Sequence, residues 1–567
     1  MKPAPLTEER FFGRTDLLDR ILRRALDLKA GYRQNLALIG PPLVGKTMVL
    51  QHAAEQLKDQ GPLLPIYLEL REGMTAAEFM NQFASTLLYR YGLTRGGVTP
   101  QSFDALCRLA RPFIPRTTEL LIKGIQKARK SPAAALSLLF EAPGELRKES
   151  GQMCVIMLDE FHRMASWGRA QPLVSLGKQI VVQKETMYVL ASSSVSEARK
   201  LLKEQLALLF GHFELILIRP FSMAASVEFL SQHAGLKSLG SSALIVLADL
   251  TEGHPFYLDC VARAIRSAEN ADPKARIRQG LEDLLWHPAG ILNMRCETLV
   301  SRIPQRRRTQ LMPVLAAVAQ GHHRTKAIAE SLGLSTQETA RNVTQLASHG
   351  LLERDGVFSY ISDRIFRFWL RSSCRIHLSP VQLDPKQATA AFSEEVSLLL
   401  DQSMSRSPQE ILDAITEFMR CFKNDLVTTH GRRIRLPRLD VHTLLLPGVP
   451  RAAVGRTRGP RWFCVPYTDW VSEADAIVLV QNLRQASKLW GRRIIIPLAG
   501  LELNAKLLLQ EQRFWVWEPA ELNTLLDLYG LPRLLPTEVQ DLAVVASVEI
   551  KPEPILSESH SEKASAS

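Results

Sequence analysis

The segment GPPLVGKT, at positions 40–47, has the residue types and spacing of a phosphate-binding loop. Its two glycines let the backbone turn N–H groups toward phosphate oxygens, and the start of a following helix adds a favourable potential for anions. In the G-x-x-x-x-G-K-[ST] pattern the lysine reaches the terminal phosphates and the next hydroxyl ligates magnesium. We therefore expect these roles for Lys46 and Thr47. The alternative is a glycine-rich turn that matches the pattern by chance.

Two carboxylates follow the apolar run CVIML at 154–158. The end of a buried strand is a place where a carboxylate can meet bound metal. We expect Asp159 to hold magnesium through water and Glu160 to polarise the attacking water, which hydrolysis requires in addition to binding. As an alternative, the acidic pair starts the next helix, where carboxylates favour the first turn. The loop at 40–47 makes the metal role the better interpretation.

Three serines, 192–194, end a third apolar run, MYVLASSS. A hydroxyl at this position could sense the terminal phosphate by a hydrogen bond, and we assign Ser193 to the catalytic residues. Serines at a strand end also cap helices. The transition state needs a cation as well, for which Arg163 and Arg199 are near in sequence, although an arginine finger from another subunit would serve equally.

Several apolar runs and helical patterns must position these groups. Five short runs are bounded by turn residues and separated by long helical patterns: NLALIG, LLPIYLEL, CVIMLDE, MYVLASSS and ELILIRPF. This alternation predicts an α/β fold with a parallel sheet covered on both faces. Residues 17–28 predict a helix whose buried stripe contains Leu18, Ile21, Leu22, Ala25 and Leu26. The interval 72–150 predicts a helical insertion with a break at GLTRGGVTP.

The motifs, in their order along residues 10 to about 372, resemble those of STAND-type and archaeal-type P-loop ATPases. FFGRTDLLDRIL is similar to the opening F-x-G-R-x-x-E-L motif, LDEFHRM to the Walker B segment, and LASSSVSEARKLL to the sensor strand. TEGHPFYLDCVARAI carries the G-x-P signature of the helical lid, and SDRIFRFWL resembles the segment that closes a winged helix. The resemblance implies an AAA+-like, ASCE-type P-loop sheet followed by a helical lid and a winged helix.

This resemblance also implies the ligands, ATP and Mg²⁺, and an ATPase activity. In the family the lid proline lies against the adenine, and this role is carried over to Pro255. The expected catalytic residues are Lys46, Glu160 and Ser193, and the expected metal ligands are Thr47 and Asp159. The expected nucleotide-binding residues are Gly40, Pro41, Pro42, Leu43, Val44, Gly45, Lys46, Thr47, Met48, Arg14 and Pro255.

Residues 325–360 predict a winged helix-turn-helix. A short helix ends at Gly333, and a second helix opens at Ser335, which forms a capping box with Glu338. We expect Ala340, Val343, Leu346 and Ala347 on its inner face and Gln337, Arg341, Asn342, Thr344 and Gln345 outside. ERDGVF predicts a hairpin with Asp355 and Gly356 in its turn.

Two roles remain open for this winged helix. The outward side chains, Lys326 and the nearby Arg302, Arg306, Arg307 and Arg308 favour DNA contact. The alternative is a packing hinge that clamps the nucleotide domain, as such domains often do in STAND-type proteins.

The region after Pro380 predicts mixed helices and strands and resembles a PD-(D/E)xK nuclease-like domain. Glu394 or Glu395 and Asp440 would match the helix and strand acids. The next strand reads Val465-Pro466-Tyr467 where a glutamate and a lysine are needed, so we expect an inactive domain.

Residues 432–461 of this region carry eight arginines and the acid Asp440. This segment is either a solvated face or a phosphate-binding surface. Trp462 either stacks on a base or belongs to the core.

Composition limits the class of protein to which the chain can belong. The chain has 567 residues, 46% of them hydrophobic, with a formal charge of +12 and seven scattered cysteines. We therefore expect a globular, cytoplasmic protein without disulfides or a membrane span, and with some preference for polyanionic partners. The predicted domains are a P-loop core at 1–220, a helical lid at 221–301, a winged helix at 302–378, a nuclease-like α/β domain at 379–536 and a disordered tail at 537–567.

Together these patterns predict an ATP-binding and ATP-hydrolysing switch that couples nucleotide state to binding of DNA or of a protein partner, including a second copy of the chain. A scaffolding ATPase without DNA contact is the first alternative. An ATP-regulated nuclease is the second.

Overall fold

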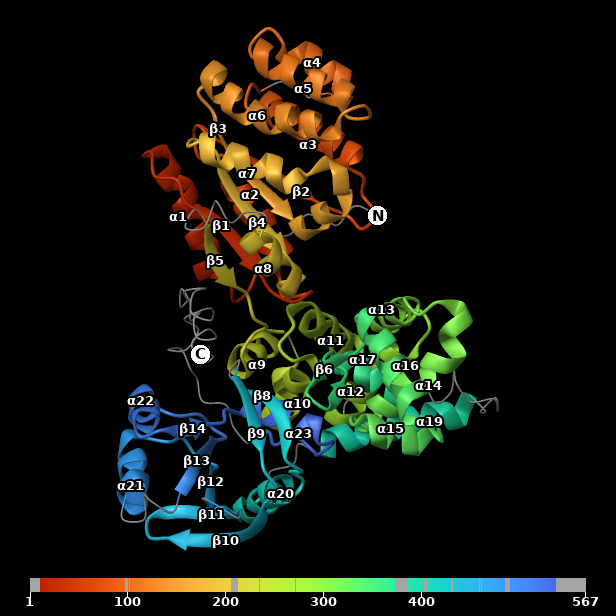
Figure 1. Ribbon diagram of the computed structural model, residues 1–567, viewed down its shortest axis with the longest axis vertical. Helices are drawn as coiled ribbons and strands as arrows, with labels where there is room; N and C mark the ends of the chain where they lie inside the picture. The colour runs from red at the N-terminus through yellow and green to blue at the C-terminus, as the bar shows by residue number, and fades with distance from the viewer. Residues whose placement is uncertain are drawn as a thin grey trace, which may run out of the picture. The chain divides into compact units, whose positions relative to one another are not determined.

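A computed structural model shows the fold of the chain (Figure 1). It describes residues 11–96, 100, 102–204, 213–233, 235–270, 272–372, 385–401, 406–429, 432–457, 459, 461–484 and 490–536. The described chain forms two compact units, one ending at Pro220 and the other beginning at Phe221. The tail predicted at 537–567 lies outside the described residues.

The first unit is built on a five-stranded parallel sheet of order β2-β3-β4-β1-β5. The strands are β1 (Asn35–Ile39), β2 (Leu63–Glu69), β3 (Met153–Asp159), β4 (Met187–Ser192) and β5 (Phe213–Leu217). Every residue of β1, β3 and β4 is buried. Because both faces of these strands are covered, their sequences are continuous apolar runs rather than alternating ones, and the predicted α/β fold is confirmed.

Helices cover this sheet. They are α1 (Thr15–Lys29), α2 (Lys46–Gln56), α7 (Pro172–Val182), α8 (Val195–Glu204) and the short-pitch helix η2 (Phe161–Ala170). The predicted stripe of α1 is partly wrong, because Leu26 is 41% exposed whereas Leu28 is buried. Leu18, Ile21, Ala25 and Leu28 follow the spacing of one helical face, and Leu26 lies one residue outside it.

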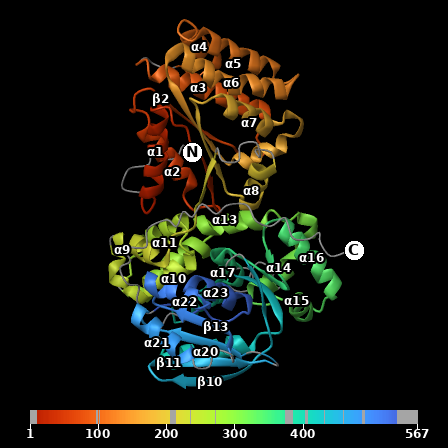
Figure 2. The same ribbon diagram turned by 60° about the vertical axis from the view of Figure 1, so that its left-hand side comes forward.

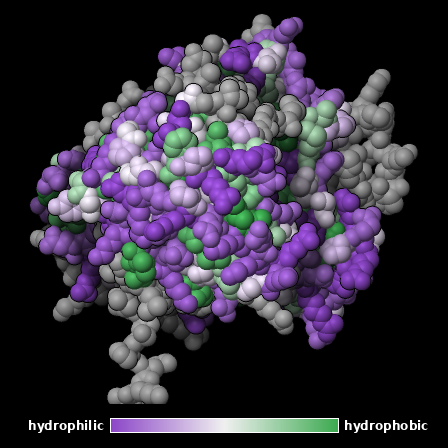
Figure 3. All heavy atoms as spheres, turned by 90° about the horizontal axis from the view of Figure 1, so that it is seen from above, coloured by the Kyte–Doolittle hydropathy of each residue, from purple (hydrophilic) through white to green (hydrophobic). Residues whose placement is uncertain are grey.

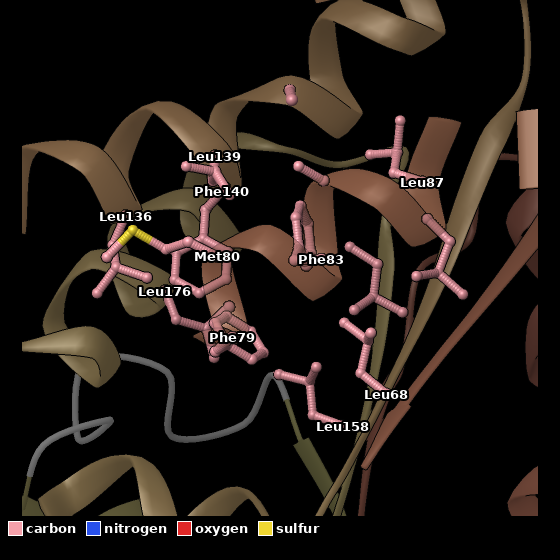
Figure 4. Packing of buried hydrophobic residues seen from close by; sticks show 14 of the residues in the cluster. Leu68, Phe79, Met80, Phe83, Leu87, Leu136, Leu139, Phe140, Leu158 and Leu176 are labelled. Carbon is pink, nitrogen blue, oxygen red and sulfur yellow. The ribbon is translucent and has the colours of Figure 1, made fainter. Parts of the chain in front are cut away.

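The predicted helical insertion lies between β2 and β3. It consists of α3 (Ala76–Leu93), α4 (Phe103–Ala110), α5 (Pro115–Lys127) and α6 (Pro132–Ser150). Figure 4 shows Phe79 and Phe83 of α3 packed near Phe140 of α6 and above Leu68 and Leu158 of the sheet. The insertion therefore shares one hydrophobic core with the sheet rather than forming a separate domain.

The second unit begins with a group of helices in the place predicted for the lid. They are α9 (Met223–Gln232), η4 (Lys237–Leu239), α10 (Ser241–Thr251), α11 (Pro255–Ser267), α12 (Pro273–Leu281), the π-helix η5 (Glu282–Trp286) and α13 (Ile291–Val300).

The segment predicted as a winged helix follows: η6 (Gln305–Arg307), α14 (Arg308–Ala319), α15 (Thr325–Leu332), α16 (Thr336–Ser348), β6 (Glu353–Asp355), β7 (Phe358–Tyr360) and α17 (Arg364–Ser372). Gly333 ends α15 with a positive φ of 64°, and Ser335 caps α16 by accepting the N–H of Glu338. The turn is shifted by one residue from the prediction: Asp355 pairs with Phe358, so Gly356 and Val357 form it.

The C-terminal part contains a mixed five-stranded sheet (Figure 2). Its strands are β10 (Asp440–Leu446), β11 (Val449–Arg456), β12 (Arg461–Tyr467), β13 (Trp490–Pro497) and β14 (Phe514–Val516), antiparallel from β10 to β12 and parallel from β12 to β14. The strands β8 (Asp425–Thr429) and β9 (Arg432–Leu436) pair antiparallel and form a separate hairpin. The helices are α19 (Pro385–Asp401), α20 (Pro408–Arg420), α21 (Glu473–Arg484), α22 (Leu503–Glu511) and α23 (Pro519–Leu528).

Hydrophilic residues predominate on the face in Figure 3, and the hydrophobic ones form small groups. Of the described helices, none is both long enough and apolar enough to cross a bilayer.

Candidate nucleotide site

The loop at 40–47 joins β1 to α2 and has the shape its sequence predicts. A Cβ on Gly40 would lie 2.2 Å from the backbone oxygen of Ile218, so a side chain there would force the two segments apart. Gly45 has a φ of 93°, which favours glycine. Leu43 also has a positive φ, of 67°. The loop therefore adopts an unusual backbone conformation immediately before the helix N-terminus, as phosphate binding requires.

Lys46 is buried inside this loop, with 4% of its surface exposed. Its Nζ donates hydrogen bonds to the backbone oxygens of Gly40 and Pro41, both at 2.8 Å. Burial lowers the pKa of Lys46, whereas the nearby carboxylates of Glu160 and Asp159 act in the opposite direction. A buried ammonium group that neutral carbonyls hold at the loop is well suited to an anionic ligand.

Asp159 and Thr47 come together as predicted. Asp159 ends β3 and is completely buried, and the Thr47 hydroxyl donates to its Oδ2 at 2.6 Å. The hydroxyl of Tyr67, on the neighbouring strand β2, donates to the same oxygen at 3.2 Å. Burial raises the pKa of Asp159, and the two hydrogen bonds act against that rise. A hydroxyl and a carboxylate at this spacing are hard oxygen donors of the kind that Mg²⁺ prefers.

Glu160 lies beside Asp159 in a left-handed backbone conformation, with a φ of 57°. Its Oε2 accepts hydrogen bonds from the Ser193 backbone N–H at 2.9 Å and from the Ser193 hydroxyl at 2.7 Å. Nδ1 of His162 is 3.3 Å from the same oxygen and 2.9 Å from the Ser192 hydroxyl. Ser193, predicted as a phosphate sensor, therefore fixes the carboxylate predicted to act on water.

Other predicted residues have different surroundings. Arg14 reaches the loop: its Nη2 donates to the backbone oxygens of Val44 at 3.5 Å and of Arg219, and burial lowers its pKa to about 10. Met48 is half-buried in the first turn of α2. Pro255 is the first residue of α11 and belongs to the second unit, so its contact with adenine stays a prediction. Arg163 donates to the backbone oxygen of Leu70 at 2.6 Å.

Sequence reasoning missed two members of this site, Tyr67 and His162. Tyr67 belongs to an apolar run, and the parallel register that places Glu69 of β2 opposite Asp159 of β3 brings Tyr67 near that carboxylate. His162 follows Glu160 by two residues, and burial lowers its pKa. Neither position has a local pattern that marks it, because both contacts depend on the fold of neighbouring segments.

The donor set fits ATP with Mg²⁺. The loop offers a buried cation at a helix N-terminus, Thr47 and Asp159 offer metal-ligating oxygens, and Glu160 is a carboxylate held in place near them. The loop follows β1, the acid predicted to ligate metal ends β3, and the serine segment ends β4, which lies between these strands. Five parallel strands in the order 2-3-4-1-5 with these groups at their ends are typical of the ASCE class. The first unit has the fold of a P-loop ATPase.

Solved structures similar to this chain have low sequence identity to it. A Walker-type ATPase of Pyrococcus abyssi is 17% identical with a TM-score of 0.42, over 65% of this chain and 99% of that one. The ORC2 protein of Aeropyrum pernix in ADPNP and ADP complexes is 13% identical with a TM-score of 0.40, over 72% and 98%. The ORC1 protein of the same organism, in complex with DNA, is 15% identical with a TM-score of 0.37, over 65% and 94%.

Similarity at this level indicates neither a shared activity nor a shared partner. No protein-family model matches the sequence, and a search of characterised proteins finds no relative.

The outer face of α16 differs from the prediction. Asn342 is buried and Ala340 is exposed, because Thr339, Val343 and Leu346 form the inner stripe at helical spacing. Gln345 is half-buried and accepts a hydrogen bond from Arg307 at 2.8 Å. The side chains left exposed are Gln337, Arg341 and Thr344 on α16, and Lys326, Arg302, Arg306 and Arg308 beside it.

The wing of this domain packs on the C-terminal hairpin. Asp355 accepts the backbone N–H and the hydroxyl of Thr428 at 2.8 and 2.9 Å. A Cβ on Gly356 would lie 2.1 Å from the backbone oxygen of Leu426, so the two hairpins are in close contact. Arg324 makes two 2.8 Å hydrogen bonds to Asp425. The winged helix is therefore joined to the C-terminal part by its wing, while most of α16 remains accessible.

The acids expected for a nuclease do not lie together in the structure. Glu395 is on α19, which packs against α12, η5 and α17, and it accepts a hydrogen bond from Arg371 at 3.1 Å. Asp440 is exposed at the start of the edge strand β10, which α20 covers instead. The assignment of Glu394 or Glu395 as partners of Asp440 is therefore wrong: α20, the next helix along the chain, packs on β10 and β11. Trp462 belongs to the core, at 6% exposure.

Proposed function

We propose that the protein binds ATP with Mg²⁺ and hydrolyses it. The observation that carries the proposal is the 2.6 Å contact between the Thr47 hydroxyl and Asp159, beside a buried lysine in a P-loop. Lys46 would hold the terminal phosphates, and Thr47 and Asp159 would hold the metal. Bound Mg²⁺ would neutralise charge on the phosphate oxygens. Glu160 would orient and polarise water, and Ser193 would keep that carboxylate in position.

Two substitutions separate binding from turnover. Lys46→Ala removes the buried cation, so nucleotide binding should be lost. Glu160→Gln keeps the shape of the side chain but removes its basicity, so binding should persist while turnover falls about 10²-fold or more. Lys58→Ala and Glu185→Gln, at exposed positions of the same unit, are the matched controls. Unchanged turnover in both site variants would contradict the proposal.

We further propose that nucleotide state controls a second binding event, for which DNA is the first candidate. The exposed arginines beside α16 and the arginine-rich segment 432–461 support a phosphate-binding surface. In that segment Arg433, Arg435, Arg438, Arg451 and Arg456 are exposed, and Arg458 lies outside the described residues. Of the predicted reading residues, Arg341 keeps that role, whereas Asn342 loses it.

A scaffolding ATPase without DNA contact is the second candidate. The burial of Asn342 and the packing of the wing on the β8–β9 hairpin favour it. Titrating labelled duplex DNA at 50 and 200 mM salt distinguishes the candidates. DNA binding predicts a steep loss of affinity at the higher salt and a weaker complex for Arg341→Ala but not for Glu330→Ala; salt-independent or undetectable binding would favour the scaffold.

We propose that the C-terminal sheet has no nuclease activity. Its strand β12 buries Cys464 and Val465 in the region where a metal-binding glutamate and a lysine would be needed. Magnesium-dependent cleavage that Asp440→Ala abolishes would contradict this proposal.

A further inference from the structure

Six charged side chains from three parts of the second unit meet in one buried cluster, which we call the ionic junction. It joins three parts of the fold. The first is the lid helix α10 with its C-terminal end, the second is α17, the last helix of the winged helix, and the third is α23 with the segment that follows it. The acids are Asp249, Glu252 and Asp527, and the bases are Arg364, Arg367 and Arg533.

Arg533 is the member that contacts the most partners. Its Nη1 donates to Asp249 Oδ1 at 2.8 Å, its Nη2 to Glu252 Oε1 at 3.0 Å, and its Nε to Asp527 Oδ2 at 2.9 Å. Only 14% of the side chain is exposed. The planar fork of a guanidinium can satisfy three carboxylates at fixed angles, whereas the single ammonium of lysine cannot reproduce this geometry.

The other two arginines share the same acids. Arg364 binds the second oxygen of Asp249, its backbone N–H lies 3.4 Å from Glu252 Oε2, and its side chain is 11% exposed. Arg367 donates to Asp527 Oδ1 at 2.9 Å. Three acids thus face three bases. Loss of one base would leave an uncompensated carboxylate in a buried place, which destabilises that place strongly.

The junction ends at a tightly constrained turn. Glu252 has a φ of 50° and follows the last residue of α10. Gly253 accepts the N–H of Phe221 at 2.9 Å, and a Cβ on Gly253 would lie 2.1 Å from the Phe221 backbone oxygen. His254 and Pro255 then begin α11. Because the turn has so little freedom, a change in the position of Glu252 has to move its neighbours.

We propose that Arg533 is a positioning residue through which the C-terminal part of the chain sets the conformation of the turn at 252–255. The coupling to ATP rests on the proposed function and on the expectation, implied by the family resemblance, that Pro255 of this turn contacts the nucleotide. Under this inference the C-terminal sheet regulates nucleotide affinity through the lid, and anything that pulls the segment after α23 away from α10 weakens nucleotide binding.

Hydrogen–deuterium exchange on the full chain tests the positioning role without nucleotide. Arg533→Gln should speed amide exchange at 249–258 at least tenfold. Arg533→Lys keeps the charge, so its effect should be smaller, and it replaces Arg533→Gln as the test variant if that substitution prevents folding. Arg513→Gln, at an exposed arginine in the same unit, is the control and should match wild type. Faster exchange confined to residues 523–536 would overturn the proposal, because Arg533 would then anchor its own segment alone.

Affinity for a non-hydrolysable ATP analogue tests the coupling. Arg533→Lys should bind it several-fold more weakly than wild type, and Arg513→Gln should bind it equally. Equal affinity of wild type and Arg533→Lys would overturn the coupling. If wild type itself binds no nucleotide, the proposed function fails, while the exchange experiment still decides whether Arg533 positions the turn.

Discussion

At the scale of single residues, the sequence predicts those site members that a linear motif identifies. Lys46 and Thr47 follow from the glycine spacing, and Asp159 follows from its place at the end of an apolar run. Tyr67 and His162 escape prediction because their contacts depend on strand register and on the course of the chain after Glu160. The prediction that Asn342 faces outward is wrong. In an amphipathic helix the sequence pattern defines the edge of the buried face only to within one residue.

Ser193→Ala tests the hydrogen bonds that hold Glu160. The substitution removes the hydroxyl donor at 2.7 Å but keeps the backbone donor at 2.9 Å. We expect kcat to fall about tenfold, a part of the usual contribution of a general base, while the Kd for ATP changes less than about twofold. Steady-state turnover and equilibrium binding measure the two effects, with Ser231→Ala as control. A weaker Kd at unchanged kcat would contradict this role.

At the scale of elements, apolar patterns predict the buried strands and the insertion, and they fail where strands are short or interrupted. The strand β11 has no clear signal in the sequence, because arginine, glycine and proline interrupt its apolar pattern. The helix that covers β10 is wrongly assigned from the sequence, because two helices, α19 and α20, precede this part of the chain and only tertiary packing shows that α20 meets β10.

Phe140→Ala tests whether the insertion is part of the core of the first unit. Phe140 is fully buried, with its ring 5.8 Å from that of Phe83. We expect the loss of this ring to destabilise the insertion by about 3–5 kcal/mol, as for other buried aromatic residues. Hydrogen exchange in α5 and α6 measures this change. Leu109→Ala, at 45% exposure, should change little, and equal effects of the two substitutions would show that Phe140 is not a core residue.

At the scale of the whole molecule, the ionic junction predicts a stability that depends on pH in the acid range. Burial alone would raise the pKa of Asp527, but Arg533 and Arg367, with Arg364, lower it to about 2. An unfolded aspartate titrates near pH ~3.9, so ionised Asp527 stabilises the fold above about pH 4 by about 2–3 kcal/mol, and this contribution is lost as pH falls toward 2.

Two further titratable groups affect this dependence: Glu252, which belongs to the junction, and His323, which interacts with Arg367 and Asp527. Burial raises the pKa of Glu252 despite Arg533 and Arg364, so its contribution to stability is lost as pH rises, opposite to that of Asp527. Burial lowers the pKa of His323. Thermal unfolding followed between pH 5 and 2 should therefore show a steep loss that Asp527→Asn makes shallower. An equally steep loss in that variant would assign the acid sensitivity to other carboxylates.

The whole account depends on one chemical statement, that the P-loop and the end of β3 hold a metal–triphosphate together. Calorimetric titration with ATP, with Mg²⁺ and with a chelator, tests it in wild type, Asp159→Asn and the control Asp104→Asn. The account predicts that Mg²⁺ tightens ATP binding at least tenfold in wild type and the control, and that Asp159→Asn loses this gain. ATP affinity that is independent of Mg²⁺ in wild type, or an undiminished gain in Asp159→Asn, would contradict it.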